Sequence, residues 1–189
     1  MKPKISASIL SLVLLIAGTA LAKDSPEQKR EKSRQMAAET LQELYKHQPS
    51  AESAIQNASG YAVFNNMGTN LLLISTARGA GIAVNNRTKE ETFMKMDSLG
   101  AGLGVGVKEY RVVFVFENEA ALNQFIDSGW EGSAQADAAA KAGHTGGAYS
   151  GAAEMRPGVW VYQITKNGLA LQLTLQGTKY RKDDNLNKK

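Results

Sequence analysis

Four cations gathered near residue 30 are the best candidates in this sequence for binding chemistry: Lys29, Arg30, Lys32 and Arg34. In a helix, residues three or four positions apart are surface neighbours, so these side chains would form two adjacent ridges. Such a helix end could meet the anionic headgroups of a membrane surface. The alternative is an ordinary solvated helix face, because Glu27 and Glu31 dilute the positive charge.

The motifs of common enzyme chemistry are absent from the sequence. There is no cysteine, and the two histidines, His47 and His144, are too far apart for metal-ligand spacing. No dinucleotide fingerprint, phosphate-binding loop or nucleophile elbow occurs. Glu117 and Glu131 could be paired as glycosidase carboxylates, but nothing in the sequence sets their separation. We therefore expect no enzymatic activity, no cofactor and no metal.

A helix is predicted to carry the four cations. Ser25 is a helix cap, Pro26 suits the first turn, and Gln28 can complete a capping box. Apolar residues then recur at helical spacing as far as Leu44, and Pro49 ends the helix.

Two further helices are predicted. One runs over Ser50–Ala58 and is ended by Gly60; the other is capped by Asn118 and ends at Gly129. The remaining apolar runs are short, rich in β-branched and aromatic residues, and broken by Gly and Asn, which predicts strands. These runs are 61–64, 71–76, 80–84, 91–96, 99–107, 110–116, 159–165 and 169–175.

The order of these elements sets the fold class. Helices do not alternate with strands, which argues against a parallel sheet, and Asn167-Gly168 between two alternating runs predicts a hairpin. The expected fold is α+β, with N-terminal helices packed on a mostly antiparallel, curled or barrel-like sheet and one further helix inserted. The basic segment 179–189 is expected to be frayed.

Residues 99–107 read LGAGLGVGV, so that Gly100, Gly102, Gly104 and Gly106 share one face of a strand. Glycine weakens a strand, and a bare glycine face implies that something presses closely against it. Packed backbone or a bound ligand would both satisfy this requirement.

Several of these pieces together resemble the SYLF domain, a lipid-binding family shared by bacterial exported proteins and eukaryotic actin- and phosphoinositide-associated proteins. The resemblance covers roughly residues 36–187. Asn65 stands where the family usually has proline, and the lipobox cysteine of many bacterial relatives is missing. The matching pieces are 58–64 (ASGYAVF), 78–81 (RGAG), the alternating glycines of 100–106, 114–116 (FVF) with 121–125, 129–132 (GWEG), 161–162 (VY), 166–169 (KNGL), Gly177 and 180–187.

The resemblance implies a non-catalytic lipid-binding or membrane-surface module. In a bacterial envelope the expected partner is an anionic phospholipid or other envelope lipid, read by the N-terminal cations. A periplasmic protein-interaction or scaffold domain without lipid specificity is the alternative, and an enzyme acting on lipid or cell wall is a third reading. A nucleic-acid partner is not expected, because removing a leader that carries two lysines and no acid lowers the net charge from +4 to +2.

The first residues have the pattern of a cleaved signal peptide. Lys2 and Lys4 precede an apolar run, and Ala20-Leu21-Ala22 has the small-x-small form of a cleavage site. The expected organisation is a signal peptide at 1–22, a basic helical lead-in at 23–35 and a SYLF-like domain at 36–187. A soluble periplasmic protein, rather than a lipoprotein, is the expected product.

Cleavage after Ala22 predicts that the exported protein begins at Lys23. The intact mass of protein recovered from the periplasm measures this directly. A retained leader, or a mass increase from acylation, would contradict the prediction.

Overall fold

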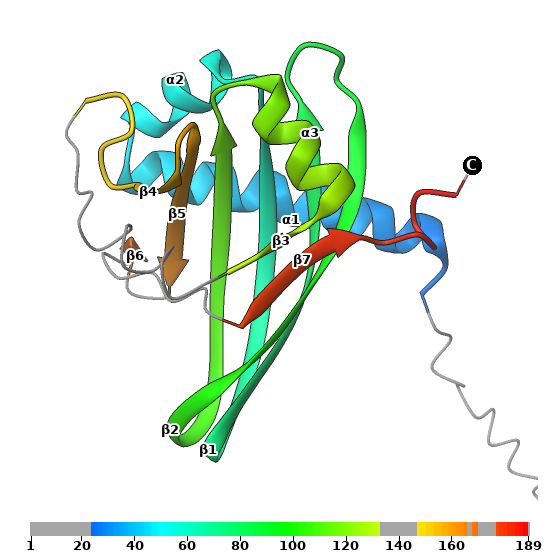
Figure 1. Ribbon diagram of the computed structural model, residues 1–189, viewed down its shortest axis with the longest axis vertical. Helices are drawn as coiled ribbons and strands as arrows, with labels where there is room; N and C mark the ends of the chain where they lie inside the picture. The colour runs from blue at the N-terminus through cyan, green and yellow to red at the C-terminus, as the bar shows by residue number, and fades with distance from the viewer. Residues whose placement is uncertain (1–23, 133–146, 166–167, 170–176, 189) are drawn as a thin grey trace, which may run out of the picture.

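The computed structural model describes residues 24–132, 147–165, 168–169 and 177–188, and within strands it leaves undescribed the side chains of 67–75 and 99–108. Within these residues, seven strands form one curled, mainly antiparallel sheet, and three helices cover its two sides (Figure 1). This confirms the α+β fold expected from the sequence. The predicted signal peptide, residues 1–22, lies outside the described residues.

Helix α1 spans Pro26–His47 and begins as the sequence predicts. The Ser25 side chain accepts a hydrogen bond from the Gln28 backbone N–H, and the Gln28 side-chain oxygen accepts one from the Ser25 backbone N–H, which completes the capping box. Helix α2, Ser50–Asn57, follows directly, and α3, Glu119–Ser128, is capped by Asn118 and ends at Gly129 with φ +70°. All three helices therefore arise from local signals.

Strands β1, Gly60–Asn85, and β2, Glu91–Phe116, form a hairpin with 26 residues in each strand. The short strands expected here are therefore wrong, because both strands continue without interruption through the Gly and Asn residues. The register shifts between Leu72 and Ile74, near the middle of β1, and both strands fold back there at the lower end of Figure 1. A bulge increases local bending, which lets a long hairpin fold over.

The two halves of β1 touch where the hairpin returns. A Cβ on Gly60 would meet the carbonyl oxygen of Val84 at 2.5 Å, and one on Gly81 would meet that of Val63 at 2.6 Å. A Cβ on Gly79 would likewise strike the backbone of Asn65. Glycine at these positions allows the close backbone contact that closes the curl.

The sheet buries both of its faces. Phe114 and Phe116 of β2 pack in one hydrophobic cluster with α3, whereas Val113 and Val115 pack in a second cluster with α1 and α2. Every residue from Val112 to Phe116 is fully buried. A strand covered on both sides reads as a continuous apolar run, which accounts for its sequence.

The smaller strands extend the sheet by pairing with β2 at two different places along its length. Strand β5, Val159–Thr165, pairs with the end of β2 and with β4, Ala153–Arg156. Strand β7, Thr178–Lys182, pairs with the beginning of β2 and with β3, Trp130–Glu131. The predicted hairpin after β5 is confirmed by its pairing with β6, Gly168–Leu169.

The expectation of a frayed C-terminus is wrong. Leu186 is 7% exposed within the second cluster, and the Asn187 side chain bonds to both the N–H and the carbonyl of Phe93 at 3.0 and 2.7 Å. We call residues 183–188 the C-terminal strap, because they bind the start of β2.

Replacement of Gly81 by Ala should lower the free energy of unfolding by about 1–3 kcal/mol, because the added methyl overlaps the Phe64 ring and the Val63 carbonyl. Denaturant unfolding measures the loss. Ala80→Val, at the exposed neighbouring position, is the control and should change stability by less than about 0.5 kcal/mol. Equal stability of both variants would show that the two halves of β1 do not pack as described.

Candidate functional site

The four cations predicted from sequence lie on the first turns of α1 and separate into two pairs. Lys29 and Lys32 line one cavity, and Arg30 and Arg34 line another. Leu186 of the C-terminal strap contributes to both cavities. The two predicted ridges thus exist, but they face different surroundings.

Arg30 holds the C-terminal strap against α1. Its Nε donates to the Leu186 carbonyl at 2.8 Å and its Nη2 to the Lys188 carbonyl at 3.1 Å. Its Nη1 also pairs with Glu27 at 2.7 Å, and its side chain is only 23% exposed. The guanidinium is therefore fully engaged within the chain.

Arg34 is engaged in the same way. It contacts carboxylate oxygens of Glu91 at 2.9 Å, Glu31 at 3.2 Å and Glu27 at 3.4 Å, and lies over the Phe93 ring. The hydrogen bond to Glu91 is the largest cause that raises the pKa of Arg34 above its usual value. Three carboxylates already balance this charge, so it offers little to an external anion.

Lys29 and Lys32 face two cations from the hairpin, Arg78 of β1 and Lys95 of β2. Together they line a cavity of about 520 Å³, which we call the basic cleft. Asp183 is an acid in the same lining, and its carboxylate accepts a hydrogen bond from the Asn185 backbone. The cleft thus brings four cations from three elements around one cavity.

Two of these cations are left over after internal pairing. Lys32 pairs with Asp24 at 2.7 Å, and Arg78 approaches Asp97 at 3.9 Å. Lys29 and Lys95 form no ion pair with any residue in the described ranges. Lys95 also lies directly opposite Arg181 across the β2–β7 pair, an arrangement of like charges that destabilises a sheet. This local excess of positive charge would attract an anion.

Arg78 and Lys95 were not identified from sequence as site residues. They are far from α1 along the chain, and each is a single cation in an ordinary strand-like run. Ala80 pairs with Lys95 in the hairpin, which makes Arg78 and Lys95 diagonal neighbours across the two strands. Only the folding of the hairpin brings these two cations to α1. The strand glycines Gly100, Gly102, Gly104 and Gly106 belong to β2, but their surroundings lie outside the described side chains.

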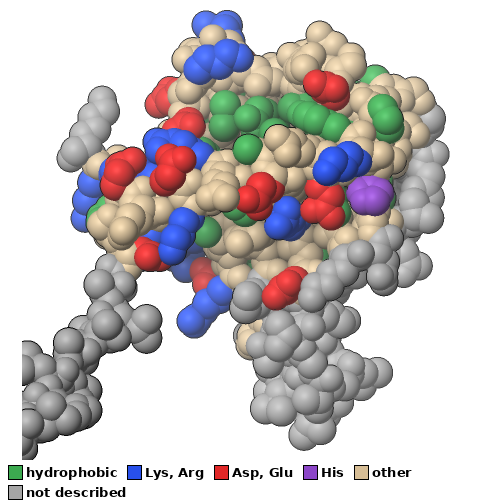
Figure 2. Space-filling model, turned by 180° about the vertical axis from the view of Figure 1, so that it is seen from behind, with side chains coloured by type: hydrophobic (Ala, Val, Ile, Leu, Met, Phe, Trp, Pro, Cys, Tyr) green, Lys and Arg blue, Asp and Glu red, His purple; other side chains and the backbone are tan. Residues whose placement is uncertain are grey.

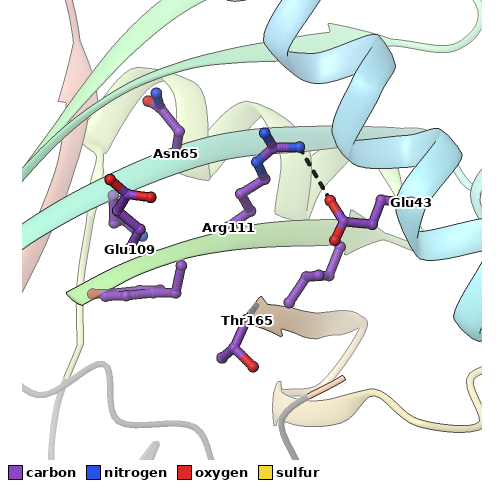
Figure 3. A pocket seen from close by; sticks show the side chains of 8 residues that line it. Glu43, Asn65, Glu109, Arg111 and Thr165 are labelled. Carbon is purple, nitrogen blue, oxygen red and sulfur yellow. Dashed lines mark hydrogen bonds and ion pairs between the residues drawn. The ribbon is translucent and has the colours of Figure 1, made fainter. Parts of the chain in front are cut away.

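A second cavity, the polar pocket, lies beside the basic cleft, and Asn65 lines both (Figure 3). Its volume is about 440 Å³, and Arg111 extends from β2 toward Glu43 of α1, with 3.2 Å between nitrogen and oxygen. A second carboxylate, Glu39, lies 3.9 Å from Arg111. Because Glu39 and Glu43 balance the charge of Arg111, the polar pocket lacks the surplus positive charge of the basic cleft.

The carboxylates considered for catalysis have separate structural partners. Glu117 accepts a hydrogen bond from the Trp160 indole at 2.9 Å, and Glu131 pairs with Lys179 at 3.3 Å. Within the described part of the chain, no group of three or more His, Asp or Glu side chains is placed to hold a metal ion. In the same part, no helix is both long and apolar enough to cross a membrane.

Positive and negative side chains are interspersed on the face seen from behind the molecule (Figure 2). This face therefore does not present a surface of one sign that could attract an ionic partner over a long range.

Comparison with known proteins indicates the family that this chain resembles in sequence. Residues 97–189 match the family model Ysc84, described as "Las17-binding protein actin regulator". The chain is also 37% identical over 153 residues to Beta cell expansion factor A of Aeromonas veronii, an alignment that covers 80% of this chain and 56% of that protein. This chain therefore spans about half the length of that relative. Residues 97–189 of the chain therefore belong to the Ysc84, or SYLF, family, which is a family of binding domains.

Replacement of Arg30 by Gln should release the C-terminal strap, because two hydrogen bonds to its carbonyls are lost. Hydrogen exchange should accelerate in residues 183–188, with a loss of about 1–2 kcal/mol in unfolding free energy. Lys32→Gln removes an equal charge from an exposed pair and should cost less than about 0.5 kcal/mol. Unchanged exchange in the strap of the Arg30 variant would show that Arg30 does not hold it.

Proposed function

We propose that this chain is a non-catalytic module that binds membrane surfaces through anionic lipid headgroups in the basic cleft. The observation that carries the proposal is the pair of unmatched lysines, Lys29 and Lys95, on facing walls of one cavity. Membership of a lipid- or actin-associated binding family supports the same reading. The leader pattern supports action in the periplasm, where phosphatidylglycerol and cardiolipin are anionic lipids.

The proposal narrows the set of lipid contacts expected from sequence. Lys29 and Lys32 remain in it, joined by Arg78 and Lys95. Arg30 and Arg34 act mainly within the chain, and they orient the end of α1 that carries the two lysines. Binding would be weak and reversible, since each cation near an anionic surface contributes only about 1 kcal/mol.

A protein-binding scaffold is the second candidate function. The description of the matched family model names a protein ligand, which favours this reading over an enzyme. A scaffold would bind its partner without lipid and with little dependence on the anionic lipid content of vesicles.

Flotation of the exported chain with vesicles containing phosphatidylglycerol tests the lipid proposal. Lys29→Gln/Lys95→Gln should weaken binding by about 2 kcal/mol, roughly 30-fold, at low salt. The wild-type advantage should shrink as salt rises, because exposed charges are screened.

The matched control is Lys46→Gln/Lys89→Gln, which removes the same charge from exposed positions outside the cleft. It should float nearly as well as wild type. Equal losses in the two variants would argue against the cleft as the site. Failure of wild type to float at low salt would argue against lipid binding and favour the scaffold.

A further inference from the structure

The basic cleft is lined by apolar residues as well as by cations. Met36 of α1, Ala80 of β1, Met94 of β2 and Leu186 of the C-terminal strap all contribute to its lining. Binding of a headgroup alone needs cations at an exposed surface, and it gains nothing from a recessed apolar wall. A cavity that combines both fits a ligand that has a charged head and an apolar chain.

We infer that the basic cleft accommodates one acyl chain, and that its ligand is a monoacyl phospholipid with an anionic headgroup. The inference rests on the proposed function and names the ligand of the same site. Its volume of about 520 Å³ is within the range of about 300–1,000 Å³ that small-molecule sites occupy. Methionine side chains are flexible and adapt to irregular chains, and Met36 is only half-buried.

The charges of the cleft favour a phosphate over a carboxylate. Four cations on three elements surround the cavity, and the ammonium groups of Lys29 and Lys95 have no internal partner among the described residues. A phosphodiester spreads its charge over oxygens that can accept from donors on different walls. The apolar residues of the lining are few, which suits one chain, so a diacyl lipid would have to leave its second chain in the bilayer.

Ala80 allows the chain-binding part to be tested apart from the charges. It is exposed on β1, and its backbone N–H donates to the Asn65 side chain at 3.2 Å, a bond that any residue except proline can make. Ala80→Trp should fill the cleft without changing its charge, and aromatic residues are well tolerated in strands. Ala80→Ser is the matched small control.

Methyl signals of ¹³C-labelled methionine report on the cleft directly. Titration with lysophosphatidylglycerol below its micelle concentration should shift the signal of Met36, the half-buried methionine of the lining. Met155, buried in the α3 cluster, should not move. Affinity should rise about fourfold per added methylene until the apolar lining is covered, and then level off.

Ala80→Trp should bind the lysolipid at least tenfold more weakly than Ala80→Ser, while its thermal unfolding stays close to that of Ala80→Ser. Glycerophosphoglycerol, which has the headgroup without the chain, should bind much more weakly than the lysolipid. Lysophosphatidylcholine and palmitate of the same chain length should also bind more weakly, because each lacks the anionic phosphodiester.

Affinity that does not depend on chain length, or an Ala80→Trp variant that binds normally, would overturn the inference and leave the headgroup proposal standing. Equal binding of lysophosphatidylcholine or palmitate would overturn the phosphate assignment. Wild type that binds lysolipid but does not float with vesicles would instead overturn the membrane-surface function. The two proposals therefore fail in distinguishable ways.

Discussion

The contact of β1 with itself is the constraint on which the rest of this structure depends. Its two halves meet at glycines, where a side chain would collide with the carbonyl oxygens of Val63 or Val84. This contact turns a long hairpin into a curled sheet that holds α3 on one face and α1 on the other. It also brings Ala80 beside Asn65, which creates one wall of the basic cleft. The cleft is thus a consequence of how the hairpin closes.

The period of α1 divides its four N-terminal cations between two tasks. Arg30 and Arg34 project toward the C-terminal strap and the start of β2, where guanidinium groups can make several hydrogen bonds in fixed directions. Lys29 and Lys32 project toward the hairpin and meet Arg78 and Lys95. Arginine therefore serves in this region for fixed internal contacts, and lysine, a flexible point charge, is left at the cavity. One helix end both fastens the fold and supplies the charge of its cleft.

The sequence predicted the structural features that depend only on residues close to one another in the chain. The capping box at Ser25, the limits of α3 and the hairpin after β5 each follow from a local pattern. It did not predict that the strands continue through the Gly and Asn residues within 60–116, because the same residues end strands when no tertiary contact continues them. It also missed the order of the C-terminal strap, since Asn187 is fixed by Phe93, which is 94 positions away. Arg78 and Lys95 were not predicted as site residues for the same reason, because they meet the cations of α1 only after the hairpin has folded.

The charges of the basic cleft would couple the stability of the fold to the binding of an anion. Lys95 opposite Arg181 costs free energy in the empty fold, and only Arg181 has an acidic partner, Asp97, among the described residues. An anion that binds the folded chain and not the unfolded one removes part of this repulsion and stabilises the fold more as its concentration rises. A neutral residue at position 95 would relieve the repulsion permanently, but it would also remove the unmatched charge that attracts the anion. Lys95 therefore lowers the stability of the fold slightly and supplies a charge that can attract an anion.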